Sequence, residues 1–143
     1  MNPTLLLRIA AGVCFLTAIG HTLGAPWTPA TGAAAAAVIG AIKALHFSAL
    51  GADRTYWDFY YGFGVSISVY LFAQSILLWQ IAAVSKSAAR QMRPLMLTFL
   101  VSNLISVAIT WKYFFVAPLI LTLATTACMI AAWVAAGRRT ASA

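Results

Sequence analysis

The chain has 143 residues, of which 63% are hydrophobic and only 8% are charged. A soluble domain usually carries about 25% charged residues, so this composition excludes a soluble globular enzyme and a disordered chain. Two cysteines are too few for a disulfide scaffold. The net charge of +7 does not indicate nucleic acid, because the basic residues lie at the ends of apolar runs rather than among aromatic side chains. These features predict an all-α integral membrane protein.

Four apolar stretches are long enough to cross a membrane. A hydrocarbon core about 30 Å thick requires about 20 apolar residues per helix, and residues 5–23, 57–84, 94–111 and 114–136 meet this requirement. Only Lys112 and Tyr113 separate the last two stretches, which predicts a tight antiparallel hairpin of helices. We therefore expect a single transmembrane domain over residues 1–143, with four helices in an antiparallel bundle.

A fifth apolar segment, residues 32–50, is ambiguous. Thr31 could cap a helix there and Gly51 could end it. However, Lys43 at the middle of a bilayer would cost about 2.5–3.5 kcal/mol. A helix that lies at the interface, or enters the membrane only partly, avoids this cost. We expect an interfacial helix between the first two spans, with a re-entrant helix as the alternative.

The basic residues predict the orientation of the chain. With both termini in the cytoplasm, six of the nine basic residues lie inside and three, Lys43, Arg54 and Lys112, lie outside. An excess of Lys and Arg on the cytoplasmic side is typical of multi-pass membrane proteins. The inner group consists of Arg8, Lys86, Arg90, Arg93, Arg138 and Arg139.

Residues 51–64 hold both acids of the chain beside aromatic side chains. One interpretation is structural: Thr55 and Asp58 form a capping box, Arg54 pairs with Asp58 at i,i+4, and the aromatic residues lie at the membrane interface. The other interpretation is a polar mouth that faces a ligand. The residues of this mouth would be Asp53, Arg54, Trp57, Asp58 and Tyr61.

Polar side chains also continue into the expected spans. Ser and Thr recur every four residues from Thr98 to Thr110, and helix packing with hydrogen bonds to backbone carbonyls explains such residues. Tyr70, Gln74 and Asn103 are harder to explain, because their polar groups need partners in hydrocarbon. They favour a polar or water-containing interior.

The two histidines, His21 and His46, both fall on the expected outer side. A metal site normally requires three or four ligands, and no spacing motif provides them, so we expect no metal or cofactor. We expect His21 to meet Asp58 at the polar end of a ligand pocket, whose depth would be lined by Phe63, Tyr70 and the row of Ser and Thr residues from Thr98 to Thr110. The alternative is that the histidine and the aspartate are each satisfied separately at the interface.

Two motifs carry a resemblance over nearly the whole chain. Gly20-His21-Thr22 ends the first expected span, and the run Tyr-Trp-Asp-Phe-Tyr-x-Gly-Phe-Gly begins at Tyr56. This pattern resembles an uncharacterised family of small bacterial four-helix inner-membrane proteins, which implies the bacterial inner membrane and no assigned activity. The layout is more loosely similar to DoxX-like proteins and to emopamil-binding and sigma-2-receptor-like proteins. The latter resemblance implies a ligand pocket only, because the spans here lack the glutamate of that family.

Three functions follow from these features. The first is an intramembrane pocket for a hydrophobic or amphiphilic small molecule, such as a lipid, a quinone or a sterol-like compound. The second is an accessory subunit that contacts a larger membrane complex or a second copy of itself, and the third is a small membrane enzyme that acts on a lipid-like substrate. Membrane lipids are expected partners and nucleic acid is not. No catalytic residue is assigned, and the candidate ligand-binding residues are His21, Asp53, Arg54, Trp57, Asp58, Tyr61, Tyr70, Gln74 and Asn103.

Overall fold

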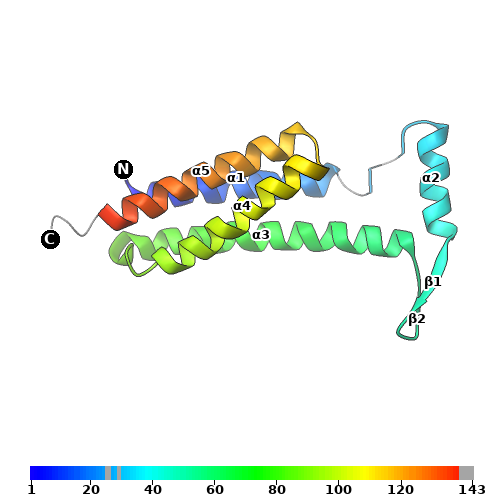
Figure 1. Cartoon of the computed structure of the whole chain (residues 1–143), viewed down its shortest axis with the longest axis horizontal. Coiled ribbons are helices and arrows are strands. Elements are labelled where there is room, and N and C mark those ends of the chain that lie inside the picture. The colour runs from blue at the N-terminus through cyan, green and yellow to red at the C-terminus, as the bar shows by residue number, and fades with distance from the viewer. Residues whose placement is uncertain (25–26, 29, 139–143) are drawn as a thin grey trace. The chain divides into compact units, whose positions relative to one another are not determined.

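The computed structural model describes residues 1–24, 27–28 and 30–138, and most of them are helical (Figure 1). Four helices are long and apolar enough to cross a membrane, which confirms the four stretches expected from the sequence. The elements in chain order are α1 (Pro3–Gly24), α2 (Ala33–Ala44), β1 (His46–Ala49), β2 (Ala52–Thr55), α3 (Tyr56–Ala88), α4 (Arg93–Tyr113) and α5 (Val116–Arg138).

The long helices differ from their expected lengths at the ends. Helix α3 has 33 residues, about 50 Å at 1.5 Å per residue, so it is longer than a hydrocarbon core is thick. Helix α4 begins with Pro94 in its first turn, where the missing N–H costs nothing. Lys112 and Tyr113 still belong to α4, so the turn of the α4–α5 hairpin lies at residues 114–115 and not at Lys112 and Tyr113 as expected.

The described residues group into two compact units, 1–18 with 71–143 (the core unit) and 19–70 (the hairpin unit). A single domain over residues 1–143 stays a prediction. In the core unit one apolar cluster draws residues from α1, α3, α4 and α5, and many of them are alanines that let helices approach closely. Its members include Leu7, Ala10, Cys14, Leu78, Ala82, Met96, Leu100, Met129, Ala132 and Ala136.

Helices α1 and α3 run antiparallel within the core unit. The Arg8 guanidinium lies over the Trp79 ring near one end of this contact. Seven residues later on α1, Phe15 packs edge-on against Phe72, with ring centroids 5.6 Å apart. Since the residue number rises on one helix as it falls on the other, each side chain of α1 faces a defined position of α3.

The hairpin unit contains a two-stranded sheet that the sequence analysis did not predict. Strands β1 and β2 pair antiparallel, with His46 opposite Thr55. Leu50 and Gly51 connect them with positive φ angles of 49° and 83°, as in the two-residue type I′ turn.

The interfacial helix expected over residues 32–50 is therefore wrong in its second half. Helix α2 ends at Ala44, and Leu45 is extended. Beyond that point the backbone groups of β1 find partners in β2 rather than in a further helical turn. The expected cap is also wrong, because Gly32 and not Thr31 is the N-cap residue, and α2 has no side-chain cap.

Candidate functional site

His21 lies near the end of α1 and reaches the backbone of α3 within the hairpin unit. Its Nε2 atom is 3.0 Å from the carbonyl oxygen of Gly64. One residue later, Thr22 Oγ1 donates a hydrogen bond to Ser68 Oγ at 3.0 Å. The expected pairing of His21 with Asp58 is therefore wrong. Gly64 lies six residues after Asp58, about 9 Å further along the helix, because α1 meets α3 well beyond its first turn.

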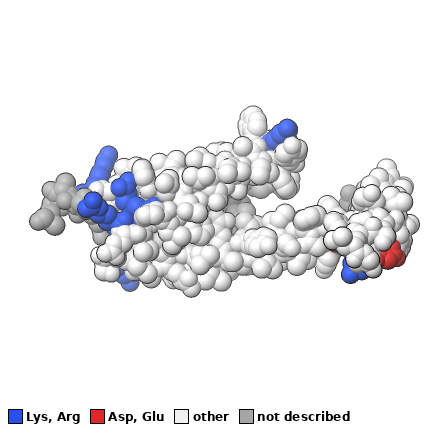
Figure 2. Space-filling view, turned by 60° about the horizontal axis from the view of Figure 1, so that its bottom comes forward, with Lys and Arg blue, Asp and Glu red and all other residues white. Residues whose placement is uncertain are grey.

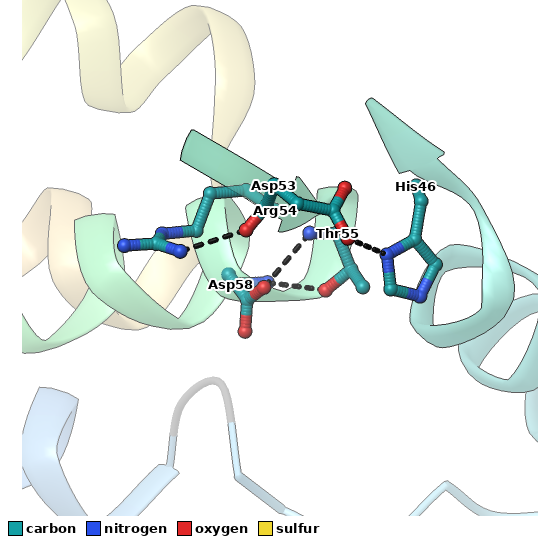
Figure 3. A network of polar contacts seen from close by, with 5 residues as sticks. All are labelled: His46, Asp53, Arg54, Thr55 and Asp58. Carbon is teal, nitrogen blue, oxygen red and sulfur yellow. Dashed lines mark hydrogen bonds and ion pairs between the residues drawn. The ribbon is translucent and has the colours of Figure 1, made fainter. Parts of the chain in front are cut away.

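Asp58 caps its own helix. The backbone N–H of Thr55 donates to Asp58 Oδ2 at 2.8 Å, and the backbone N–H of Asp58 donates to Thr55 Oγ1 at 3.1 Å (Figure 3). This reciprocal arrangement confirms the predicted capping box. The carboxylate is exposed and lies at the positive end of the α3 dipole. Helix initiation accounts for this residue without a ligand.

Arg54 does not pair with Asp58, contrary to expectation. Its Nη1 atom donates instead to the backbone carbonyl oxygen of Asp53 at 2.7 Å (Figure 3). The expected i,i+4 contact requires both residues to be helical, whereas Arg54 belongs to strand β2.

Among the described residues, an ion pair joins His46 and Asp53, whose Nδ1 and Oδ2 atoms are 3.0 Å apart. These residues are diagonal neighbours on one face of the hairpin. Their side chains are 58% and 71% exposed, so the pair lies in a solvent-accessible position where an ion pair contributes little.

Trp57 and Tyr61 take part in a chain of ring contacts. Lys43 Nζ lies 4.6 Å from the Trp57 ring centroid, and the Trp57 and Tyr61 rings are 6.1 Å apart. Tyr61 in turn packs edge-on against Trp27 at 5.4 Å. Together with the capping box, these contacts support the structural interpretation of residues 51–64. The structure gives His21, Asp53 and Asp58 three different partners and does not bring them together.

The polar residues of the spans also have local explanations. Tyr70 is 71% exposed, so the expectation that it lines a polar interior is wrong. Gln74 is half-buried. Asn103 is buried, and its amide donates to the carbonyl oxygen of Phe99 at 2.9 Å and lies 3.7 Å from Met129 Sδ.

The row of hydroxyl side chains on α4 bonds its own helix. The hydroxyls of Thr98, Ser102 and Ser106 each donate a hydrogen bond to the backbone carbonyl four residues earlier, which supports the packing interpretation.

A groove of about 420 Å³ lies between α1 and α3 in the core unit, and the sequence analysis missed it. Phe15, Ile76 and Trp79 give it apolar walls, yet each of these side chains is about half exposed, so the groove is open at the helix surface. The signal in the sequence is the pair of small residues Ala11 and Gly12 within an apolar span. The full lining is Ala11, Gly12, Phe15, Ser75, Ile76, Trp79 and Gln80.

Arg8 lies beside this groove. Its Cζ atom is 5.1 Å from the centroid of the Trp79 ring, which forms part of the wall. The Nε atom of Arg8 is buried and has no hydrogen-bond partner among the described residues. Arg93 has the same features. Its Cζ lies 4.2 Å from the centroid of the Trp133 ring, and its Nε is buried and has no hydrogen-bond partner among the described residues.

Basic residues gather at one end of the core unit, where α1 and α4 begin and α3 and α5 end (Figure 2). Both acids of the chain, Asp53 and Asp58, belong to the other unit. Among the described residues of the core unit, Lys112 lies at the opposite end of α4. The basic group consists of Arg8, Lys86, Arg90, Arg93 and Arg138, and Arg139 lies outside the described residues.

Comparison with known proteins adds no relative: no protein-family model, no curated protein and no solved structure matches this chain. Among the described residues, no three His, Cys, Asp or Glu side chains are grouped as metal ligands. The candidate site is the groove between α1 and α3, with Arg8 beside it.

Proposed function

We propose that this chain is a multi-pass protein of a bacterial inner membrane. Helices α1, α3, α4 and α5 cross the bilayer as an antiparallel bundle, and α2 lies at the outer interface. Both termini lie in the cytoplasm. The length and hydropathy of the four helices support the spans. The group of five basic residues at one end of the core unit supports the orientation, since Lys and Arg accumulate on the cytoplasmic side.

We further propose that the protein binds a hydrophobic or amphiphilic small molecule in the groove between α1 and α3. The observation that carries this proposal is the groove itself, whose 420 Å³ lie within the range of roughly 300–1,000 Å³ of small-molecule sites. Its walls combine aromatic and aliphatic side chains with two polar groups, Ser75 and Gln80. On helices that cross a bilayer, such a groove takes its ligand directly from the hydrocarbon.

The proposal moves the binding site away from residues 51–64. There the side chains bond one another or the nearby backbone, whereas the groove offers surface that no protein side chain covers. Gly12 shows this locally, because a Cβ atom built at this position would meet no heavy atom within 4 Å. A Cβ atom at Gly12 therefore has open space around it, and Gly12 lines the groove, so a larger side chain at this position is expected to extend into it.

Filling the groove tests the proposal. Gly12→Leu places a side chain in the groove, and Gly20→Leu is a matched control on the same helix, since a Cβ atom at Gly20 also meets nothing within 4 Å and Gly20 does not line the groove. Leucine has a higher helix propensity than glycine, so this effect on α1 is the same in both variants. Native mass spectrometry of protein purified in mild detergent should show a lipid-sized adduct on the wild type and on Gly20→Leu, and should show its loss on Gly12→Leu.

Two outcomes would count against the proposal. An adduct retained by Gly12→Leu at the wild-type level would place the ligand elsewhere. A copurifying protein in place of a small molecule would favour the accessory-subunit hypothesis.

A further inference from the structure

We infer that the ligand of the groove carries an anionic headgroup and that Arg8 binds it. This inference rests on the proposed function and names the class of ligand: an amphiphile with an apolar chain and a carboxylate or phosphate head. Three observations carry it, namely the position of Arg8, its unpartnered nitrogen and the absence of acidic residues from the core unit.

Arg8 has the right position to meet a headgroup. It precedes Ala11 and Gly12 by three and four residues, and residues at this spacing share one face of a helix. Both of these residues line the groove, as does Trp79, over whose ring the Arg8 guanidinium lies at 5.1 Å. Arg8 is also only five residues from the start of α1, about 7.5 Å along the helix axis. A chain in the groove would thus have its head near the helix end and its apolar part towards Phe15.

The hydrogen bonding of Arg8 is incomplete in the protein alone. Its Nε is buried and has no partner among the described residues, although a guanidinium is permanently charged and carries five N–H donors. The Trp79 ring attracts the charge but accepts no conventional hydrogen bond. An anionic oxygen would reach the guanidinium at its terminal N–H groups rather than at the buried Nε, and charge-assisted bonds from Arg to carboxylate or phosphate are among the strongest in proteins.

The surrounding charges favour an anion over a zwitterion. The basic group at this end of the core unit contains five described cations, and both acidic residues of the chain belong to the other unit (Figure 2). No acidic side chain of this unit therefore competes for Arg8, and none attracts the cationic part of a zwitterionic head. A fatty-acid carboxylate and the phosphate of an anionic phospholipid share the required chemistry.

Matched lipids test the inference on the full chain in neutral detergent. Dioleoyl phosphatidylglycerol and dioleoyl phosphatidylcholine share their chains and differ in net charge, and oleate and oleyl alcohol form the corresponding single-chain pair. Titration followed by native mass spectrometry should show that the anionic member of at least one pair binds about tenfold more tightly. The pair that shows the preference identifies the source of the headgroup.

Variants connect this preference to Arg8. Arg8→Gln keeps a hydrogen-bonding side chain but loses the charge, so the preference should fall below about twofold while the neutral or zwitterionic partner binds as before. Arg8→Lys should keep a clear preference. Lys112→Gln is the matched control, because it removes one positive charge at the opposite end of α4 and should leave the preference unchanged.

The outcomes separate this inference from the proposed function. Equal binding of charged and uncharged partners to the wild type, with loss of both in Gly12→Leu, would overturn the anionic head and leave the groove in place. An unchanged preference in Arg8→Gln would overturn the role of Arg8. No binding of any of the four lipids would overturn the inferred ligand class, whereas absence of any small-molecule adduct on the purified wild type would overturn the proposed function. If Arg8→Gln fails to fold, Arg8→Met takes its place as a second uncharged variant, and an unchanged preference in it would likewise overturn the role of Arg8.

Discussion

His21 and Gly64 are joined by a hydrogen bond in which the direction of donation is determined. The Gly64 carbonyl oxygen, 3.0 Å from the imidazole Nε2, can only accept, so Nε2 must carry the proton. His21 therefore exists either as the neutral tautomer protonated at Nε2 or as the imidazolium. In both states the ring attaches the end of α1 to the backbone of α3, beside the bond from Thr22 to Ser68.

Replacing His21 should weaken this attachment. His21→Ala should lower the free energy of unfolding by about 1 kcal/mol, the typical contribution of one hydrogen bond, and His21→Gln should recover part of the loss because its amide can donate from a similar position. Thermal unfolding in detergent measures both effects. The control is His46→Ala, which removes an exposed ion pair and should cost less than about 1 kcal/mol. Equal stability of His21→Ala and the wild type would contradict the attachment.

The capping box predicts a local effect at the start of α3. Thr55→Ala removes the hydroxyl that accepts the Asp58 N–H, and loss of an N-cap typically costs about 1 kcal/mol. Amide hydrogen exchange should therefore be faster at Asp58 and in the first turn of α3. Thr55→Ser keeps the acceptor and should exchange like the wild type. Unaltered exchange in Thr55→Ala would mean that the cap does not stabilise this helix end.

The turn between β1 and β2 predicts opposite effects at two adjacent residues. Leu50 has a φ of 49°, which Asn tolerates better than Leu, so Leu50→Asn should slow amide exchange in both strands. Gly51 has a φ of 83°, and Gly51→Ala should accelerate exchange because a Cβ atom is strained in this conformation. Leu50 is fully exposed, so its replacement removes no packing. Exchange that changes in the same direction in both variants would contradict the type I′ turn.

Asn103 distinguishes the groove from a polar interior. It bonds the carbonyl of its own helix at Phe99, packs against Met129 and does not line the groove. Asn103→Leu should therefore leave the lipid adduct unchanged in native mass spectrometry, with Gly12→Leu as the variant that loses it. Loss of the adduct in Asn103→Leu, with the fold intact by circular dichroism, would return the ligand to the interior expected from the sequence.

Several features depend only on interactions between residues close in sequence, and these could be predicted from the sequence. The four long helices follow from uninterrupted apolar stretches, and Pro94 marks the first turn of α4. The capping box is equally local, because Thr55 and Asp58 are three residues apart and need only the helix that they begin. Hydrogen bonds from Ser and Thr to the carbonyl four residues earlier also require no second element.

The strand pairing, the partner of His21 and the groove depend on contacts between different segments of the chain. Nothing in residues 45–50 indicates a strand until residues 52–55 provide its partner, and once Arg54 is in a strand the helical spacing to Asp58 no longer applies. Whether His21 meets Asp58 or Gly64 depends on how far α1 slides along α3, and similar apolar side chains along both helices do not specify this register. Within the core unit, the groove and the position of Arg8 over Trp79 likewise depend on how α1 and α3 are aligned. Side-chain periodicity tells which residues can face a neighbouring helix, but the packing of the two surfaces selects the residues that meet.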